Sequence, residues 1–281
     1  MRTPEEMLDL ILGVAKEDER IRAVTMAGSR ANKDCPVDIY QDFDIAFFVK
    51  DVAPFWDNEE WIEEKFGKPS LLQKPESMDL IPPENNGNYV YLMVFPDGNR
   101  IDLTVAVAPC IDEGEPVVLL LDKDGTFPKI QIAEDFWYIK RPTAKYFADC
   151  CNEVHWCLNN VAKGIAREEP SYAMMMLNFV RDMLILQLEW YVGMNHDFMI
   201  SAGKHGKYFK KYLPENLYER FKATYPNAEA ESMWKAAFET LYLFGDVARE
   251  VAAKLEFTYD EQEEKGIETY MKQVKSGALK Y

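Results

Sequence analysis

The chain has 281 residues, of which 48% are hydrophobic and 13% aromatic, so it can bury a core and is not expected to be disordered. Its formal net charge is −16 and its pI is about 4.7. This acidity argues against a nucleic-acid partner, because such binding depends on Lys and Arg side chains that neutralise phosphates. It would attract cationic small molecules, although solubility alone also explains it.

The most apolar stretch, residues 173–192, carries Arg181, Asp182 and Glu189 in its middle. These charges favour a buried helix over a membrane span. The N-terminus lacks the apolar stretch of a signal peptide, and the five cysteines lack the spacing of a metal site. We therefore expect a soluble, cytoplasmic protein with reduced thiols and no membrane partner.

The first half predicts a small mixed sheet with flanking helices. Thr3, followed by Pro and two acids, caps a helix that should run to about residue 18. The turn-forming residues 96–99 lie between two β-rich runs and predict a hairpin. The predicted strands are residues 21–27, 42–49, 89–95, 100–107 and 117–121, with a short helix at residues 58–66.

Past residue 140 the β-branched runs give way to helical periodicity. The predicted helices are residues 143–163, 171–194, 214–223, 228–255 and 260–275. The predicted fold class is therefore α+β. A catalytic domain with a mixed β-sheet and flanking helices spans residues 1–140, and an α-helical bundle spans residues 141–281.

Two carboxylates stand one residue apart on an apolar run, Asp42-Phe43-Asp44-Ile45. On a strand their side chains share a face, roughly 7 Å apart, and they repel one another unless a cation lies between them. Magnesium suits such a pair. If a neighbouring strand brings Asp102 alongside, the three acids would hold two Mg²⁺ ions about 3.5–4 Å apart and catalyse in-line displacement at phosphorus.

Gly28 and Ser29 end the strand that precedes this pair. Gly28 would let backbone amides approach a phosphate, Ser29 would add a hydroxyl at a helix N-terminus, and Arg30 would reach the same anion. Alone, a Gly-Ser pair is most often a turn and an Asp-x-Asp a solvated strand edge. Found in order and each between apolar residues, together with Asp102, they favour nucleotidyl transfer.

This order of motifs resembles the DNA polymerase β-like nucleotidyltransferase superfamily. Residues 28–32, 100–104 and 204–214 further resemble the aminoglycoside 6-adenylyltransferases, a streptomycin-modifying family, and the similarity extends over nearly the whole chain. The resemblance implies that residues 1–140 form the nucleotidyltransferase catalytic domain and that residues 141–281 form a helical domain that binds substrate and nucleotide. It also implies transfer of AMP from ATP, the co-substrate, to a hydroxyl of the streptidine ring of streptomycin, with release of pyrophosphate.

Site roles follow from the residues and this resemblance. Asp42 and Asp44 are expected to hold magnesium and, through it, the triphosphate, while Asp102 is either the third metal ligand or the base that deprotonates the acceptor. Lys204 and Lys207 are candidates for contacts to the β- and γ-phosphates, where they would neutralise the leaving pyrophosphate. Without the resemblance, this lysine-rich stretch is better interpreted as a solvated basic patch.

A cationic antibiotic needs carboxylates in its pocket. Asp182 and Glu189 lie on one face of the long apolar helix, about two turns apart. They would line the substrate site or, as an equal alternative, form a structural ion pair with Arg181 or another base. Glu84, in a Pro-rich loop, is a further and weaker candidate.

Two other functions stay open on the sequence. One keeps the chemistry and changes the acceptor to a lincosamide or a protein hydroxyl. The other is a non-catalytic nucleotidyltransferase-like binding protein or antitoxin, which would be expected to have lost at least one acid; the presence of all three disfavours it. The sequence does not distinguish a monomer from a homodimer.

Overall fold

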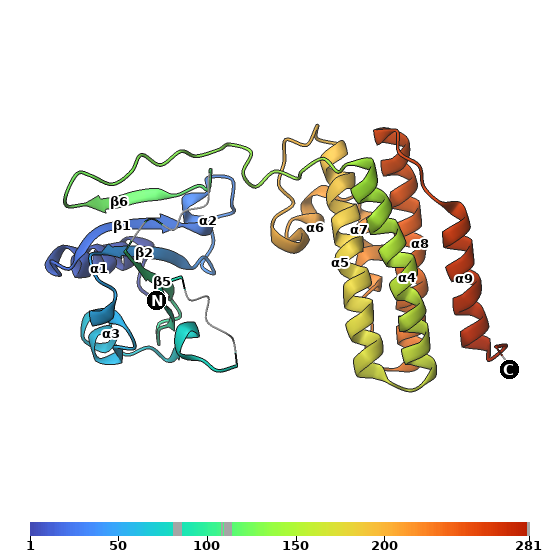
Figure 1. Ribbon diagram of the computed structural model, residues 1–281, viewed down its shortest axis with the longest axis horizontal. Helices are drawn as coiled ribbons and strands as arrows, with labels where there is room; N and C mark the ends of the chain where they lie inside the picture. Colours follow the sequence, from blue (N-terminus) through green and yellow to red (C-terminus); the bar gives the residue numbers. More distant parts are fainter. Residues whose placement is uncertain (81–85, 108, 110–113, 280–281) are drawn as a thin grey trace. The chain divides into compact units, whose positions relative to one another are not determined.

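A computed structural model describes residues 1–80, 86–107, 109 and 114–279 (Figure 1). The chain divides into two compact units, Met1–Phe136 and Trp137–Tyr281. Unit 1 holds the β-sheet and unit 2 is helical, as the predicted α+β fold requires. Each unit has its own buried core.

Unit 1 is built on one six-stranded sheet in the order β3-β4-β5-β2-β1-β6. Its strands are β1 (Ile21–Ala27), β2 (Phe43–Val49), β3 (Leu71–Gln73), β4 (Tyr89–Val94), β5 (Arg100–Ala106) and β6 (Val118–Asp122). The sheet is mixed, because β2 and β5 pair in parallel and the other neighbours are antiparallel. The predicted hairpin between β4 and β5 is confirmed.

One face of the sheet carries the core of unit 1. The helices α1 (Pro4–Glu17) and α3 (Glu59–Phe66) share this core with alternate residues of the strands, including Phe43, Ile45 and Phe47 of β2. Because side chains alternate along a strand, Asp44 and Ala46 point to the opposite face. The sheet therefore separates an apolar, helix-covered face from the face that carries the carboxylates.

Three short elements complete unit 1, namely the single-turn helix α2 (Gly28–Ala31) and the 3-10 turns η1 (Ala53–Phe55) and η2 (Pro75–Ser77). The helix α1 begins at a capping box, in which the Thr3 hydroxyl accepts from the Glu6 amide and the Glu6 carboxylate accepts from the Thr3 amide. This cap is the start that the sequence predicts.

Unit 2 is a helical bundle whose long helices agree with the predicted ones to within a few residues. It contains α4 (Ala144–Ala166), α5 (Pro170–Met194), η3 (Lys204–Gly206), α6 (Phe209–Tyr212), α7 (Glu215–Ala223), α8 (Ala230–Leu255) and α9 (Glu261–Ser276). The apolar helix α5 packs against both α4 and α8. No helix in the described part of the chain is long and apolar enough to cross a bilayer.

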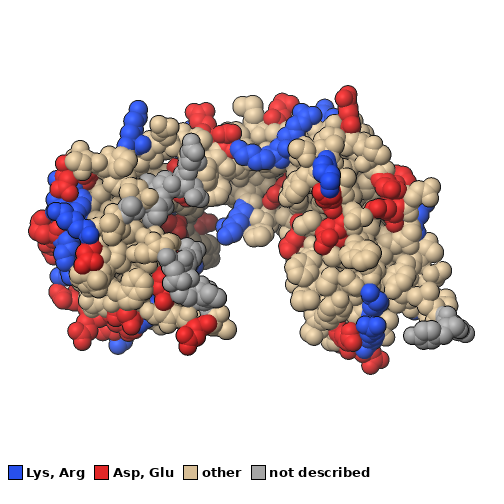
Figure 2. Space-filling model, viewed as in Figure 1, with Lys and Arg blue, Asp and Glu red and all other residues tan. Residues whose placement is uncertain are grey.

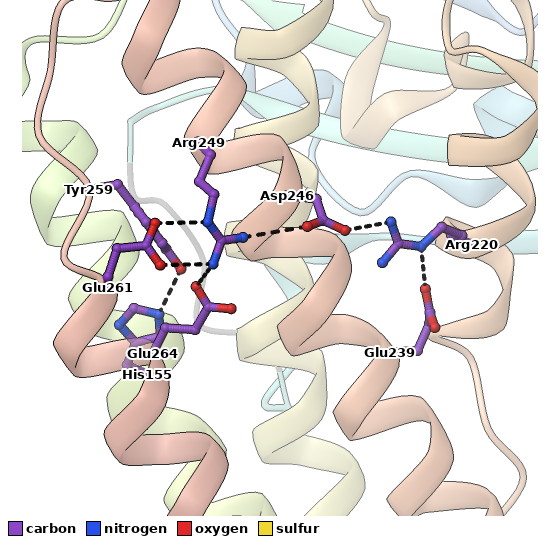
Figure 3. Close-up of polar contacts among 8 residues, drawn as sticks. All are labelled: His155, Arg220, Glu239, Asp246, Arg249, Tyr259, Glu261 and Glu264. Atoms are coloured by element: carbon purple, nitrogen blue, oxygen red, sulfur yellow. Dashed lines mark hydrogen bonds and ion pairs between the residues drawn. The ribbon is translucent and has the colours of Figure 1, made fainter.

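Charged side chains fix α7 and α9 on α8 (Figure 3). Arg249 of α8 bonds Glu261 at 2.9 Å and also pairs with Glu264, both on α9. Asp246 pairs with both Arg249 and Arg220, and Arg220, on α7, also pairs with Glu239. Nearby, His155 of α4 contacts the Tyr259 hydroxyl. Exposed pairs contribute about 1 kcal/mol or less each, so the network specifies which helices meet more than it adds stability.

Candidate active site

The sheet register brings the three acids together. The parallel pairing of β2 with β5 sets Asp44 directly opposite Asp102, so their side chains leave the same face of the sheet. Asp42 lies one residue before β2, two residues from Asp44, and its carboxylate shares a cationic neighbour with Asp102. The side chains of Asp42 and Asp102 are 35% and 22% exposed, which leaves the cluster open to a ligand from solvent.

That cationic neighbour is Arg100, the first residue of β5. Its Nε and Nη2 donate to the two oxygens of Asp102 at 2.8 and 2.7 Å, and its Nη1 lies 3.4 Å from Asp42 Oδ2. The bond to Asp102 raises the pKa of Arg100 above its usual value. Sequence reasoning assigned no role to Arg100, although its place two residues before Asp102 on the same strand face was a usable signal.

The electrostatics of the cluster centre on Asp44. Burial, followed by the charges of Asp102 and Asp42, raises the pKa of Asp44 to about 6, and Arg100 offsets only part of this. Among the residues that the structure describes, no three His, Cys, Asp or Glu side chains are pre-arranged around a single ion position. The guanidinium of Arg100 instead satisfies two of the three acids.

Gly28 closes the site where β1 ends. The pairing of Ala27 with Asp44 brings the chain against the Asp44 carboxylate, and Gly28 has a φ of +67°. A Cβ at this position would lie 1.9 Å from Asp44 Oδ2. The next residue, Ser29, accepts a hydrogen bond from Gln41 Nε2 through its carbonyl oxygen at 3.1 Å. Glycine is therefore required at position 28 both by its conformation and by lack of space.

Arg30 supports the start of β2 from α2. Its Nε donates to the carbonyl of Asp42 at 3.0 Å, its Nη2 donates to that of Gln41 at 2.8 Å, and its guanidinium lies 3.9 Å from the centre of the Phe43 ring. Burial lowers the pKa of Arg30. In this structure Arg30 positions the backbone that carries Asp42, and its contact with an anion stays a prediction.

The remaining candidates lie in unit 2 or outside the described residues. Lys204 and Lys207 are exposed at η3, and neither forms an ion pair with a residue that the structure describes. Asp182 is exposed on α5, whereas Glu189 is half-buried on the same helix, and burial raises the pKa of Glu189 to about 7. Glu84 lies outside the described residues.

Arg181 is not paired with either acid of α5 in the described part of the chain. Its Nη1 donates to Asn178 Oδ1 at 2.6 Å, its Nη2 donates to the carbonyl of Thr224 at 2.9 Å, and it lies over the Tyr225 ring. These contacts tie α5 to the end of α7. Among the described residues, neither Asp182 nor Glu189 forms the ion pair with Arg181 or another base that the sequence offered as an alternative.

Carboxylates on two adjacent parallel strands of a mixed sheet, beside the glycine that follows a third strand, are the arrangement expected of a nucleotidyltransferase, and the relatives of the chain support this class. The chain belongs to the streptomycin adenylyltransferase family, whose family model matches residues 1–274.

Similar proteins include one named aminoglycoside 6-adenylyltransferase from Campylobacter jejuni, 40% identical over 271 residues, which cover 94% of this chain and 93% of the relative. Another of the same name, from Bacillus subtilis strain 168, is 39% identical over 280 residues, with 96% and 97% covered. A crystal structure of an aminoglycoside 6-adenyltransferase from Bacillus subtilis is 36% identical, with a TM-score of 0.49 and 98% and 99% of the two chains covered.

Proposed function

We propose that this protein transfers AMP from ATP to a hydroxyl of streptomycin and releases pyrophosphate, in a magnesium-dependent reaction. The observation that carries the proposal is the register of β2 and β5, which sets Asp44 opposite Asp102 with Asp42 beside them. Membership of the streptomycin adenylyltransferase family and the names of its relatives support an aminoglycoside as the acceptor.

Asp42, Asp44 and Asp102 are the residues that would hold magnesium, in the proposed mechanism two ions. The fit rests on the crowding of these acids. Asp44 is half-buried, and burial together with the charges of Asp102 and Asp42 raises its pKa more than the charge of Arg100 lowers it. Oxygen ligands of this charge are those that magnesium prefers. Bound there, magnesium would neutralise charge on the triphosphate and align the displacement at its α-phosphorus.

Further residues are proposed to bind the phosphates of ATP or to act on the acceptor hydroxyl. Gly28 would let backbone amides approach a phosphate, and Ser29 and Arg30 would contact the same anion through a hydroxyl and a guanidinium. Lys204 and Lys207 would neutralise the pyrophosphate as it leaves, because charge develops there in the transition state. Asp102 would serve as a metal ligand or as the base, which requires it to come within hydrogen-bond reach of the acceptor hydroxyl.

The proposed acceptor carries guanidinium groups, which pair with carboxylates. Glu189 suits this role because its carboxylate is half-buried, carries no ion pair with a described residue and gains from a cation that replaces lost solvation. Asp182 lies on the same helix and would supply a second, more exposed carboxylate. The surface of both units bears many acidic side chains (Figure 2), as the net charge of −16 requires.

Pyrophosphate release tests the proposal. ATP and magnesium are supplied with streptomycin, spectinomycin, kanamycin or lincomycin in separate reactions, and ATP binding is measured in the same preparation. Release with streptomycin alone supports both the chemistry and the acceptor. Release only with another compound overturns the acceptor, and silence with all four in protein that binds ATP overturns the function.

A further inference from the structure

Arg100 lies where the proposed metal site needs positive charge. It bonds both oxygens of Asp102 and lies 3.4 Å from Asp42 Oδ2, and its charge also acts on Asp44, so it contacts two of the acids directly and influences the third. Bidentate guanidinium–carboxylate pairs are among the strongest charged hydrogen bonds in proteins. A metal ion that took these carboxylate oxygens as ligands would have to displace it.

We propose that Arg100 is a built-in counter-cation that keeps metal out of the site until nucleotide arrives, and that it then turns to the triphosphate. The inference rests on the proposed function, since it takes Asp42, Asp44 and Asp102 as the metal ligands. It adds a positioning role for Arg100 and an order of binding, in which metal enters together with ATP.

The environment of Arg100 allows this exchange. Its side chain is 43% exposed, so the guanidinium can leave the carboxylates without disturbing the core. Its backbone is fixed in β5 opposite β2, so the side chain pivots about a defined point beside the cluster. Once displaced, the guanidinium needs another anion, and a triphosphate offers the planar pair of oxygens that arginine prefers.

The proposal predicts that metal and nucleotide bind with positive coupling, and that much of this coupling is lost without Arg100. Metal alone competes with the guanidinium, whereas metal with nucleotide meets carboxylates that the guanidinium has already left. Because coupling is reciprocal, metal must also strengthen nucleotide binding in the native protein.

The experiment measures Mn²⁺ binding to the whole chain, by the electron paramagnetic resonance signal of free Mn²⁺, with and without a non-hydrolysable ATP analogue. Without nucleotide, Arg100→Gln should bind Mn²⁺ about tenfold more tightly than the native protein, since tenfold corresponds to about 1.4 kcal/mol of lost competition. With nucleotide the difference should shrink to about twofold or less, because the guanidinium no longer competes.

Arg22→Gln is the matched control. Arg22 is the second residue of β1 in the same unit and pairs with Asp124 and Glu19, so its loss changes net charge equally and also removes an arginine partner from two carboxylates. Its Mn²⁺ affinity should stay within about twofold of the native value, as expected for screened charges away from the site. If Arg22→Gln gains as much Mn²⁺ affinity as Arg100→Gln, the gain is an effect of net charge, and the proposal is overturned.

Further variants separate this inference from the proposed function. Asp44→Asn added to Arg100→Gln should abolish the tight Mn²⁺ binding; if binding persists, the metal lies elsewhere and the proposed function fails. If Asp44→Asn abolishes binding but Arg100→Gln binds Mn²⁺ as the native protein does, only the role of Arg100 fails. Arg100→Lys keeps the charge and the fold but loses the bidentate bond, so it should show an intermediate affinity.

Discussion

Gly28 and Asp44 are in direct contact at the centre of the site. A Cβ at position 28 would lie 1.9 Å from Asp44 Oδ2, and the φ of Gly28 is +67°. The backbone that follows β1 therefore packs against the carboxylate of Asp44, which lies opposite Asp102 of the neighbouring strand β5. The position of Asp44 thus depends on a residue with no side chain.

Gly28→Ala should therefore lower both stability and activity. The left-handed backbone alone costs about 1–2 kcal/mol for a residue with a Cβ, and the contact with Asp44 adds to it. Gly13→Ala is the control, since Gly13 lies within α1 and a Cβ there meets no atom within 4 Å. It should keep activity and gain about 0.5–1 kcal/mol in urea unfolding; equal effects of the two changes would contradict this account.

The stability of the metal-free protein should depend on Asp44 and pH. The pKa of Asp44 is about 6 in the folded protein, above its ordinary value of 3.8, so the folded state holds a proton that the unfolded chain releases. This stabilising contribution is complete below pH 4 and is lost as pH rises through 6. At pH 7 Asp44→Asn should be more stable than the native protein by about 1–2 kcal/mol, after allowance for solvent screening.

Unfolding by urea in the presence of EDTA, at several values from pH 4 to pH 8, checks this expectation. The difference between native protein and Asp44→Asn should be near zero at the acidic end and grow toward neutral pH. If the difference in unfolding free energy between the two proteins is the same at every pH, the crowding of the carboxylates does not destabilise the metal-free protein, and the prediction is wrong.

Lys207→Ala should weaken ATP binding several-fold and leave streptomycin binding nearly unchanged, because the proposed contact is with the leaving phosphates. Lys210→Ala is the control, since Lys210 is also exposed, belongs to the same basic stretch and has no proposed contact. Calorimetric titration of both variants with a non-hydrolysable ATP analogue checks the prediction. If the two variants bind the nucleotide with equal affinity, Lys207 does not contact the phosphates and belongs to a solvated basic patch.

Streptomycin should bind more tightly as pH rises from 6 to 8. Burial raises the pKa of Glu189 to about 7, so its carboxylate ionises over this range while guanidinium groups keep their charge. The affinity should improve roughly five- to tenfold, following the ionised fraction. Glu189→Gln should lose this pH dependence, and Glu250→Gln, a change at an exposed site on α8, should keep it.

The strands and long helices could be predicted because local patterns determine them. Alternating apolar residues around Asp44 indicate its strand, and the box of Thr3 and Glu6 marks where α1 begins. The short strand β3 could not be predicted, because its residues are mostly exposed and it exists through pairing with β4. The position of β3 is thus determined by its tertiary contacts and not by its local sequence.

The site was predictable in part for the same reason. Spacing along one strand placed Asp42 and Asp44 on a common face, but their meeting with Asp102 depends on a parallel pairing between strands far apart in the chain. The bridge from Arg100 to Asp102 and Asp42 depends on that register as well. Helical periodicity placed Asp182 and Glu189 on one helix and could not tell that only Glu189 is half-buried.

The central claim is that the protein uses the carboxylates of Asp42, Asp44 and Asp102 to transfer AMP from ATP to an aminoglycoside. The mass of streptomycin after incubation with ATP and Mg²⁺ tests this claim most directly. The account predicts a product heavier by one adenylyl group with the native protein and with Asp51→Asn, a control at an exposed turn. With Asp42→Asn the rate should fall at least about a hundredfold, while the fold is retained. An unmodified antibiotic with the native protein, or full conversion by Asp42→Asn, would contradict the account.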